Sequence, residues 1–285
     1  MSGFSADWLA LREPFDMAAR SRKVRAAALA SVGDLDPVAI VDLACGTGSG
    51  LRALAPTIAT RQTWRLVDND LSLLARAAES PRPERAQVNA VPVDLAHDLE
   101  AALDGAVDLV TTTALLDLVS EPWLERLAIE CAARRLPLYA ALSYDGRIEL
   151  APKDPGDAAI IAAVNAHQLN DKGFGPALGP QAAAQAIARF AAIGYFVDRE
   201  AADWVIEPQD REMQQALLAG WASAAQEFGA PHLDEIIAWL TRRRELVAAG
   251  RSSMRVGHID LFARPTEMRR AARSQSNSTS PPSRR

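Results

Sequence analysis

Short runs of apolar, often β-branched residues recur along the first half of the chain. Each run has the length of a buried strand and is followed by a segment whose apolar positions have helical spacing. The predicted strands are 37–41, 62–67, 87–93, 107–113 and 136–144, and the helices between them begin near residues 51, 71 and 120. This alternation predicts an α/β fold with a parallel sheet and helices on both faces.

The pattern changes after Gly146. The elements predicted there are a helix over 154–168, a loop rich in glycine and proline over 170–180, a helix over 181–193, a strand over 195–206, helices over 209–226 and 233–249, and a last strand over 254–262. Residues 5–32 look helical, and Pro14 is expected to divide them because proline removes a helical N–H. No apolar periodicity remains over 265–285, so this tail is predicted to be disordered.

The stretch from Asp42 to Gly50 reads Asp-Leu-Ala-Cys-Gly-Thr-Gly-Ser-Gly and joins the first strand to a helix. Glycines there let a ligand approach the backbone and the helix N-terminus. The dinucleotide fingerprint would require glycine or alanine at Leu51, and no lysine follows as a phosphate-binding loop requires. Asp42 would repel a pyrophosphate but suits a ligand with an ammonium group and no phosphate, such as S-adenosylmethionine. A tight structural turn is the alternative.

Residues 42–48 resemble motif I of the class I S-adenosylmethionine-dependent methyltransferases. The resemblance covers about residues 38–145. It implies a Rossmann-like, doubly wound, seven-stranded and mostly parallel sheet with an antiparallel last strand and helical insertions. It assigns Asp42, Ala44, Gly46 and Gly48 to the methionine part of the cofactor S-adenosylmethionine, although the family more often has glycine in place of Ala44. The product would be S-adenosylhomocysteine.

Polar residues after the later strands are assigned to the same ligand. Asp68, about 20 residues past the glycine turn, is expected to accept hydrogen bonds from both ribose hydroxyls, with Asn69 beside it. The resemblance implies that Asp94 receives the adenine amino group and that Leu95 lines the ring. Asp94 could equally cap the next helix. Thr113, at the end of the fourth strand, is also assigned to the cofactor.

The resemblance also implies a domain organisation. Residues 1–36 would form a helical segment over the cofactor, with Arg12 against the cofactor's carboxylate. Residues 37–264 would form the methyltransferase domain, with insertions at about 150–180 and 208–250 for the substrate or a lid. The family usually has a short hairpin in place of the second insertion. We therefore interpret its two helices as a lid or as an element that could join two copies of the chain in a homodimer.

Asp117 and His167 are the candidates for catalysis. Asp117 follows the fourth strand, where the family faces the transferred methyl group, and could act as a base or orient the substrate. A helix-start acid favoured by the helix dipole is the alternative. His167 precedes the glycine-rich loop and could also serve as a general base.

The predicted acceptor pocket is completed by Tyr144, Asp171, Lys172 and Phe174. For His167, Asp171, Lys172 and Phe174 the alternative is an ordered surface connection, with Asp171 as a cap and Phe174 as a packed ring. Three further histidines, His97, His232 and His258, are predicted to be peripheral. Trp221 and Trp239 are interpreted as core of the inserted helices, with a place in a pocket as the alternative.

Composition and short motifs limit the classes of partner and the location expected for the protein. The net charge of −5 argues against binding bulk nucleic acid, and an Asn-Pro-Pro-aromatic tetrad, which would indicate transfer to DNA amines or protein glutamine, is absent. No apolar run has the length of a membrane span, and charged residues interrupt any signal-peptide pattern. The two cysteines fit a reducing cytosol, so a cytoplasmic location is expected, and no Cys/His spacing indicates a metal site.

The predicted activity is methyl transfer from S-adenosylmethionine to a small-molecule acceptor by in-line displacement, assisted by a base if the acceptor is protonated. Two alternatives stay open. The same fold could use the cofactor for aminopropyl transfer or lyase chemistry. The chain could also be a non-catalytic cofactor-binding module whose inserted helices serve a protein partner.

Overall fold

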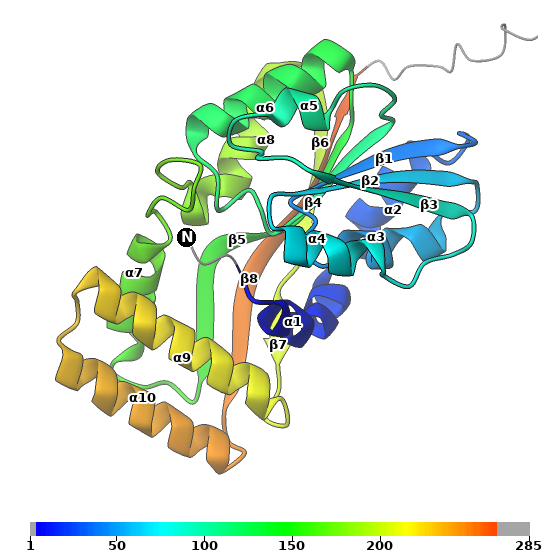
Figure 1. Ribbon diagram of the computed structural model, residues 1–285. Helices are drawn as coiled ribbons and strands as arrows, with labels where there is room; N and C mark the ends of the chain where they lie inside the picture. The colour runs from blue at the N-terminus through cyan, green and yellow to red at the C-terminus, as the bar shows by residue number, and fades with distance from the viewer. Residues whose placement is uncertain (1–3, 267–285) are drawn as a thin grey trace, which may run out of the picture.

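The computed structural model describes residues 4–266 and is built on one eight-stranded sheet (Figure 1). The strands are β1 (Val38–Leu43), β2 (Gln62–Asp68), β3 (Ala86–Pro92), β4 (Leu109–Thr113), β5 (Leu138–Ala151), β6 (Tyr195–Ala201), β7 (Trp204–Ile206) and β8 (Ser253–Pro265). Their order is β3-β2-β1-β4-β5-β8-β6, with β7 paired to β8 beside this path. The first five strands are parallel, and β8 is antiparallel to β5, β6 and β7. The predicted Rossmann-like fold class is confirmed.

The sheet has one strand more than predicted because the strand expected over 195–206 is two strands. Between β6 and β7, the Ala202 N–H donates to the His258 carbonyl at 2.8 Å. The Asp203 carboxylate accepts from Arg147 at 2.7 Å and from Arg255 at 3.1 Å. These bonds anchor the turn between the two strands.

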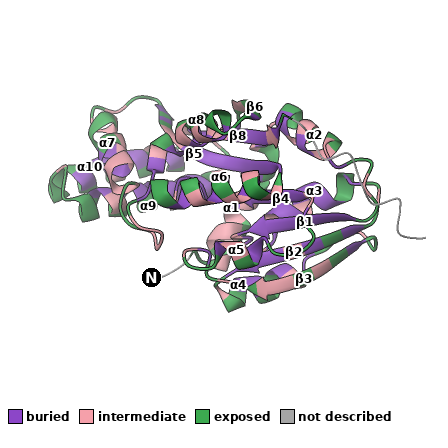
Figure 2. Ribbon diagram, turned by 90° about the horizontal axis from the view of Figure 1, so that it is seen from above, coloured by how far each residue is buried: buried purple, intermediate pink, exposed green. Residues whose placement is uncertain are grey.

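Helices cover both faces of the parallel part (Figure 2). The helices are α1 (Ala6–Ala19), α2 (Arg22–Ala30), α3 (Ser49–Leu54), α4 (Leu71–Ala78), α5 (Leu99–Ala102), α6 (Glu121–Arg134), α7 (Asp157–His167), α8 (Ala182–Ala192), α9 (Arg211–Phe228) and α10 (Leu233–Ala248), with 3-10 turns at Ala55–Thr57 and Gly179–Gln181. One core joins α5, α6 and α8 to one face of the sheet, and a second joins α2, α3 and α4 to the other. Alternate residues of β8 serve the two cores: Leu261 and Ala263 lie in the first and Phe262 in the second.

A third core lies beyond the parallel sheet. β5 and β8 are 14 and 13 residues long and continue past their neighbours, as Figure 1 shows. β7, α7, α9 and α10 bury apolar side chains against this extension, including Trp221 and Trp239. The inserted helices therefore form a lobe at the end of the two long strands, next to the carboxyl edge of the sheet.

The N-terminal helices divide at Ser21 and not at Pro14, so that prediction was wrong. α1 continues through Pro14 to Ala19. The Ser21 hydroxyl accepts the Val24 N–H at 3.2 Å and caps α2, while the Ser21 N–H donates to the Asp260 carboxylate at 2.9 Å. The cap and the bond to β8 place the break there.

Within residues 4–266, no helix combines the length and the apolar character needed to cross a membrane. Most of the predicted disordered tail, residues 267–285, lies outside the described part of the chain. The predicted tail begins at Pro265, and the structure places Pro265 at the end of β8.

Candidate active site

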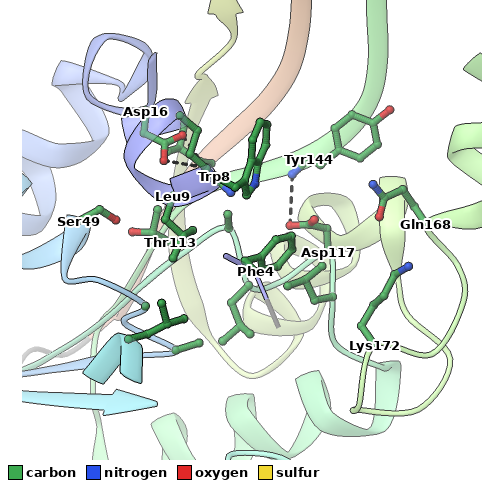
Figure 3. Close-up of a pocket in the computed structure, with 18 of the residues that line it drawn as sticks. Phe4, Trp8, Leu9, Asp16, Ser49, Thr113, Asp117, Tyr144, Gln168 and Lys172 are labelled. Atoms are coloured by element: carbon green, nitrogen blue, oxygen red, sulfur yellow. Dashed lines mark hydrogen bonds and ion pairs between the residues drawn. The ribbon is translucent and has the colours of Figure 1, made fainter. Parts of the chain in front are cut away.

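A cavity of about 1310 Å³ opens at the carboxyl ends of the parallel strands (Figure 3). Ligands of open α/β sheets bind at this edge. The residues of the sequence prediction that line it are Arg12, Asp42, Ala44, Gly46, Asp68, Asn69, Leu95, Thr113, Asp117, Tyr144, His167, Asp171, Lys172 and Phe174. The cavity therefore joins the predicted cofactor residues to the predicted acceptor residues.

Two predicted cofactor residues lie elsewhere. Gly48 has φ +87° and turns toward α4, where a Cβ would come within 2.9 Å of the Ser80 hydroxyl. Its role in the structure is close helix packing. Asp94 accepts from the Ala96 N–H and contacts His97 Nδ1, both at 3.0 Å. Asp94 thus holds the turn after β3. It does not cap the next helix, because the N-cap of α5 is Asp98. Its neighbour Leu95 lines the cavity.

Three non-glycine residues around the cavity have left-handed backbone conformations. Ala44, Ala114 and Leu142 have φ +51°, +52° and +58° and follow or lie in the adjacent strands β1, β4 and β5. Each such conformation costs about 1–3 kcal/mol and is kept where the surroundings impose it, most often at functional sites. At Ala44 this conformation gives a physical reason for the glycine that the family usually has there.

Asp42 is buried beneath this edge with 1% exposure. Neither of its carboxylate oxygens has a hydrogen-bond partner among the described residues. Burial, and the nearby charge of Asp68, raise its pKa to about 7 against the opposing effect of Arg20. Gly50 leaves the space for it, because a Cβ there would lie 2.5 Å from an Asp42 oxygen. An uncompensated buried carboxylate fits a ligand that brings a positive charge, such as the ammonium group of S-adenosylmethionine.

Asp42→Asn should raise the melting temperature of the cofactor-free protein by a few degrees at pH 8. The folded-state pKa of Asp42, about 7, lies above the ordinary value of 3.8. Ionised Asp42 therefore costs the folded state about 4 kcal/mol above pH 7, and this cost disappears as the pH falls toward 4. The advantage of the variant should shrink over that range in thermal melts. An advantage independent of pH would contradict the assignment of an ionised Asp42.

Asp68, at the end of β2, is 9% exposed and holds the glycine turn. Its Oδ2 accepts the Gly46 N–H at 2.8 Å, and its Oδ1 accepts the Asp70 N–H at 3.0 Å. Asp70 instead caps α4 by accepting from the Ser72 and Leu73 N–H groups. A carboxylate has about four lone-pair sites, so Asp68 keeps acceptor capacity for two hydroxyl groups of a ligand.

Asp117 lies in the loop between β4 and α6, where α6 begins after its Ser120 cap. The carboxylate is 93% buried, since 7% of the residue is exposed, and burial raises its pKa to about 6. Oδ1 accepts the Tyr144 N–H at 3.4 Å, and Oδ2 makes no hydrogen bond within residues 4–266. Figure 3 shows the side chain facing the cavity between Thr113 on one side and Lys172 on the other. Its pKa suits a general base near neutral pH.

α1 forms one wall of the cavity through Trp8, Leu9 and Arg12, and Phe4, which precedes the helix, also lines it. Arg12 is already paired, because its Nε donates to Asp16 at 2.9 Å and its guanidinium lies 5.1 Å from the Trp204 ring. The structure therefore brings Arg12 to the site but gives it a protein carboxylate as partner.

The acceptor-side residues make the following contacts. His167 Nε2 contacts Glu227 at 3.0 Å. The Tyr144 hydroxyl donates to Asn165 at 2.7 Å. Asp171 accepts the Gly173 and Gly175 N–H groups at 2.6 and 3.0 Å, as the cap alternative expected, and the Phe174 ring packs 5.4 Å from Trp123.

Sequence reasoning placed His258 on the periphery, which was wrong. It is 5% exposed, lines the cavity and lies 4.6 Å from the Trp204 ring. Burial lowers its pKa to about 3, and its Nδ1–H donates to the Val256 carbonyl at 3.1 Å, so the ring is neutral. A histidine inside a strand with apolar neighbours is a signal that could have indicated burial.

Arg20 contacts a residue of the cavity wall, a contact that sequence reasoning did not predict. Its Nη2 donates to the Thr113 hydroxyl at 2.9 Å, while Nε and Nη1 are buried without partners among the described residues. Arg20 is the C-cap residue of α1, and the break at Ser21 separates it from the basic residues Arg22, Lys23 and Arg25 of α2. Of the two tryptophans assigned to the inserted helices, Trp239 is core, with its Nε1–H on Asp157 at 2.9 Å, and Trp221 also lines the cavity.

Among residues 4–266, no group of three or more His, Cys, Asp or Glu side chains is placed to hold a metal ion. The cavity has an acidic part at the strand ends, with Asp42 and Asp68, joined to a part that has apolar walls from α1, β7 and α9.

Residues 40–136 match the family model described as a methyltransferase domain. A search of curated proteins found no match. A methyltransferase of Thiobacillus denitrificans solved with S-adenosylhomocysteine is 13% identical, over 92% of this chain and 99% of that one, with a TM-score of 0.43. A cyclopropane-fatty-acyl-phospholipid synthase-like protein of Lactobacillus casei is 15% identical, over 87% and 98% of the two chains, with a TM-score of 0.46.

The matched residues 40–136 run from β1 through β4 to the end of α6, and they supply the glycine turn, Asp68, Leu95, Thr113 and Asp117. The buried, unpartnered Asp42 and the acceptor capacity of Asp68 fit S-adenosylmethionine as the cofactor. The chain therefore contains a segment, residues 40–136, that matches a methyltransferase domain.

Proposed function

We propose that the enzyme transfers a methyl group to a small protic acceptor bound in the half of the cavity between α1 and the inserted lobe, with Asp117 as the base. The observation that carries this is the continuity of one cavity from Asp42 and Asp68 to Tyr144 and Lys172. Its volume of about 1310 Å³ exceeds the roughly 300–1,000 Å³ usual for one small ligand, which leaves room for an acceptor beside the cofactor.

On the cofactor side, S-adenosylmethionine supplies an electrophilic methyl group when bound. Asp42 would balance the charge of its ammonium group from beneath the cavity wall, and Asp68 would accept from its ribose hydroxyls. Leu95 and Val93, which also line the cavity, would offer apolar surface to its adenine. Gly46 leaves the backbone accessible under the cofactor and close to Leu9 of α1.

On the acceptor side, Asp117 would take the proton from the accepting atom as that atom attacks. The apolar walls from α1 and the lobe would exclude water and hold the acceptor in line, and alignment alone supplies much of the rate of such a displacement. Above pH 6, Asp117 is ionised and can act in this way. His167 is placed at the rim on Glu227 and would contribute to binding more than to proton transfer.

The test is incubation with methyl-labelled S-adenosylmethionine and a panel of small acceptors, followed by mass spectrometry. The proposal expects label in an acceptor together with S-adenosylhomocysteine. Methylthioadenosine in place of S-adenosylhomocysteine would instead indicate aminopropyl or lyase chemistry.

Dimerisation through α9 and α10 stays a prediction. The buried faces of these helices pack within the chain, on each other and on α7.

A further inference from the structure

The acceptor half of the cavity has one predominantly apolar wall. Trp8 from α1, Trp204 from β7 and Trp221 from α9 line it together with Tyr144 and Leu217. These side chains offer flat and aliphatic surface to the body of a ligand. α9 also presents Gly220 to the cavity, where an added Cβ would meet no atom within 4 Å. This wall therefore fits the apolar body of a ligand, and an aromatic ring is the body we test.

Most charged groups of this half already have partners. Arg12 is paired with Asp16 at 2.9 Å, and His167 contacts Glu227 at 3.0 Å. His258 is buried and neutral, with its Nδ1–H on the Val256 carbonyl. These groups leave no free charge for a ligand.

Lys172 differs from them. It lies on the loop between α7 and the 3-10 turn at Gly179, is half-buried and lines the cavity. It forms no ion pair with any residue in the described part of the chain. Figure 3 shows its ammonium end directed toward the space that Gln168 and Asp117 also face. A half-buried ammonium group without an ion pair, beside an apolar wall, is stabilised by an anionic group of a ligand.

Asp117 supplies the second polar anchor. It is 93% buried, since 7% of the residue is exposed, and its Oδ2 has no hydrogen-bond partner within residues 4–266. Because a carboxylate repels an anion, the anionic group of a ligand would lie at Lys172 and a protic group at Asp117.

Resting on the proposed function, we infer that the methyl acceptor is a small amphipathic acid with an apolar body, an anionic group held by Lys172 and a protic group facing Asp117. Carboxylate and phosphate share this chemistry. Neutral and cationic molecules with the same body would leave Lys172 unpaired.

The inference is tested by calorimetry on protein saturated with S-adenosylhomocysteine, using four probes that share one phenol ring: 4-hydroxyphenylacetate, 4-hydroxybenzylphosphonate, 4-hydroxyphenylacetamide and tyramine. At least one anion should bind about tenfold or more tightly than the amide and the amine, which is the size of one charge-assisted hydrogen bond. The tighter of the two anions identifies carboxylate or phosphate as the group.

Lys172→Met should remove the preference for the anion, and Lys153→Met, an exposed lysine outside the cavity, should keep it. Trp221→Ala should weaken the binding of the anion and the binding of the amide by the same factor. Equal or tighter binding of the amide or amine, a preference that survives Lys172→Met, or no binding of either anion would overturn the inference. Binding of S-adenosylhomocysteine is measured first in the same samples, and its failure would count against the proposed function instead.

Discussion

Asp117→Asn should lower kcat by about 10²–10⁴-fold, the range of general base catalysis, and should change the affinity for S-adenosylmethionine by less than threefold. Asparagine keeps an oxygen for the Tyr144 N–H, which Asp117 accepts at 3.4 Å, but it cannot take a proton. The loss should therefore appear in turnover and not in folding. Single-turnover kinetics with the acceptor and a binding titration with the cofactor measure the two quantities separately.

The pH profile gives an independent check on Asp117. The base must be ionised to act, and its pKa is raised to about 6 by burial. In the wild type, kcat should rise with pH through about 6 and level off above it. Asp117→Glu should recover part of the activity. A kcat reduced less than tenfold in Asp117→Asn, with the same profile as the wild type, would show that alignment without a base carries the reaction.

Asp68→Ala should weaken S-adenosylmethionine binding by roughly 30–1,000-fold, which corresponds to about 2–4 kcal/mol for two charge-assisted hydrogen bonds to ribose. The alanine also releases the Gly46 N–H, which Asp68 accepts at 2.8 Å and which positions the glycine turn. Affinities from calorimetry measure the combined loss.

Asp68→Asn separates the two effects. Asparagine can still accept the Gly46 N–H but loses the charge and half of the acceptor capacity. An intermediate loss is expected for it. If Asp68→Ala changes the affinity by less than twofold, Asp68 does not hold the ribose.

The carboxyl edge of the sheet was readable from the sequence because local chemistry determines it. The apolar strand 38–43 and the glycine turn after it are evident in the sequence. Three acids lie at or after the ends of predicted strands: Asp42, Asp68 and Asp117. In a parallel sheet, such ends meet at one edge. The same rule could not show that Leu95 lines the cavity while Asp94 does not. An acid that holds a turn and an acid that binds a ligand occupy the same place after a strand.

Long-range packing explains what the sequence did not show. Arg12 lies over the Trp204 ring and Arg20 donates to Thr113, and both partners are distant in the chain. The break at Ser21 likewise involves a distant residue, because the Ser21 N–H donates to Asp260, 239 residues away. His258 enters the cavity because β8 continues past the parallel sheet and pairs with β7. Neither the break nor the extension leaves a periodic pattern in the sequence near these residues.

The central claim is that this cavity binds S-adenosylmethionine through Asp42 and Asp68. Its most direct test is calorimetric titration of the wild-type protein with S-adenosylmethionine, S-adenosylhomocysteine and NAD. The account predicts micromolar binding of the first two ligands and none of NAD, because a buried acid at the end of β1 disfavours a pyrophosphate. Binding of NAD without S-adenosylmethionine would contradict it.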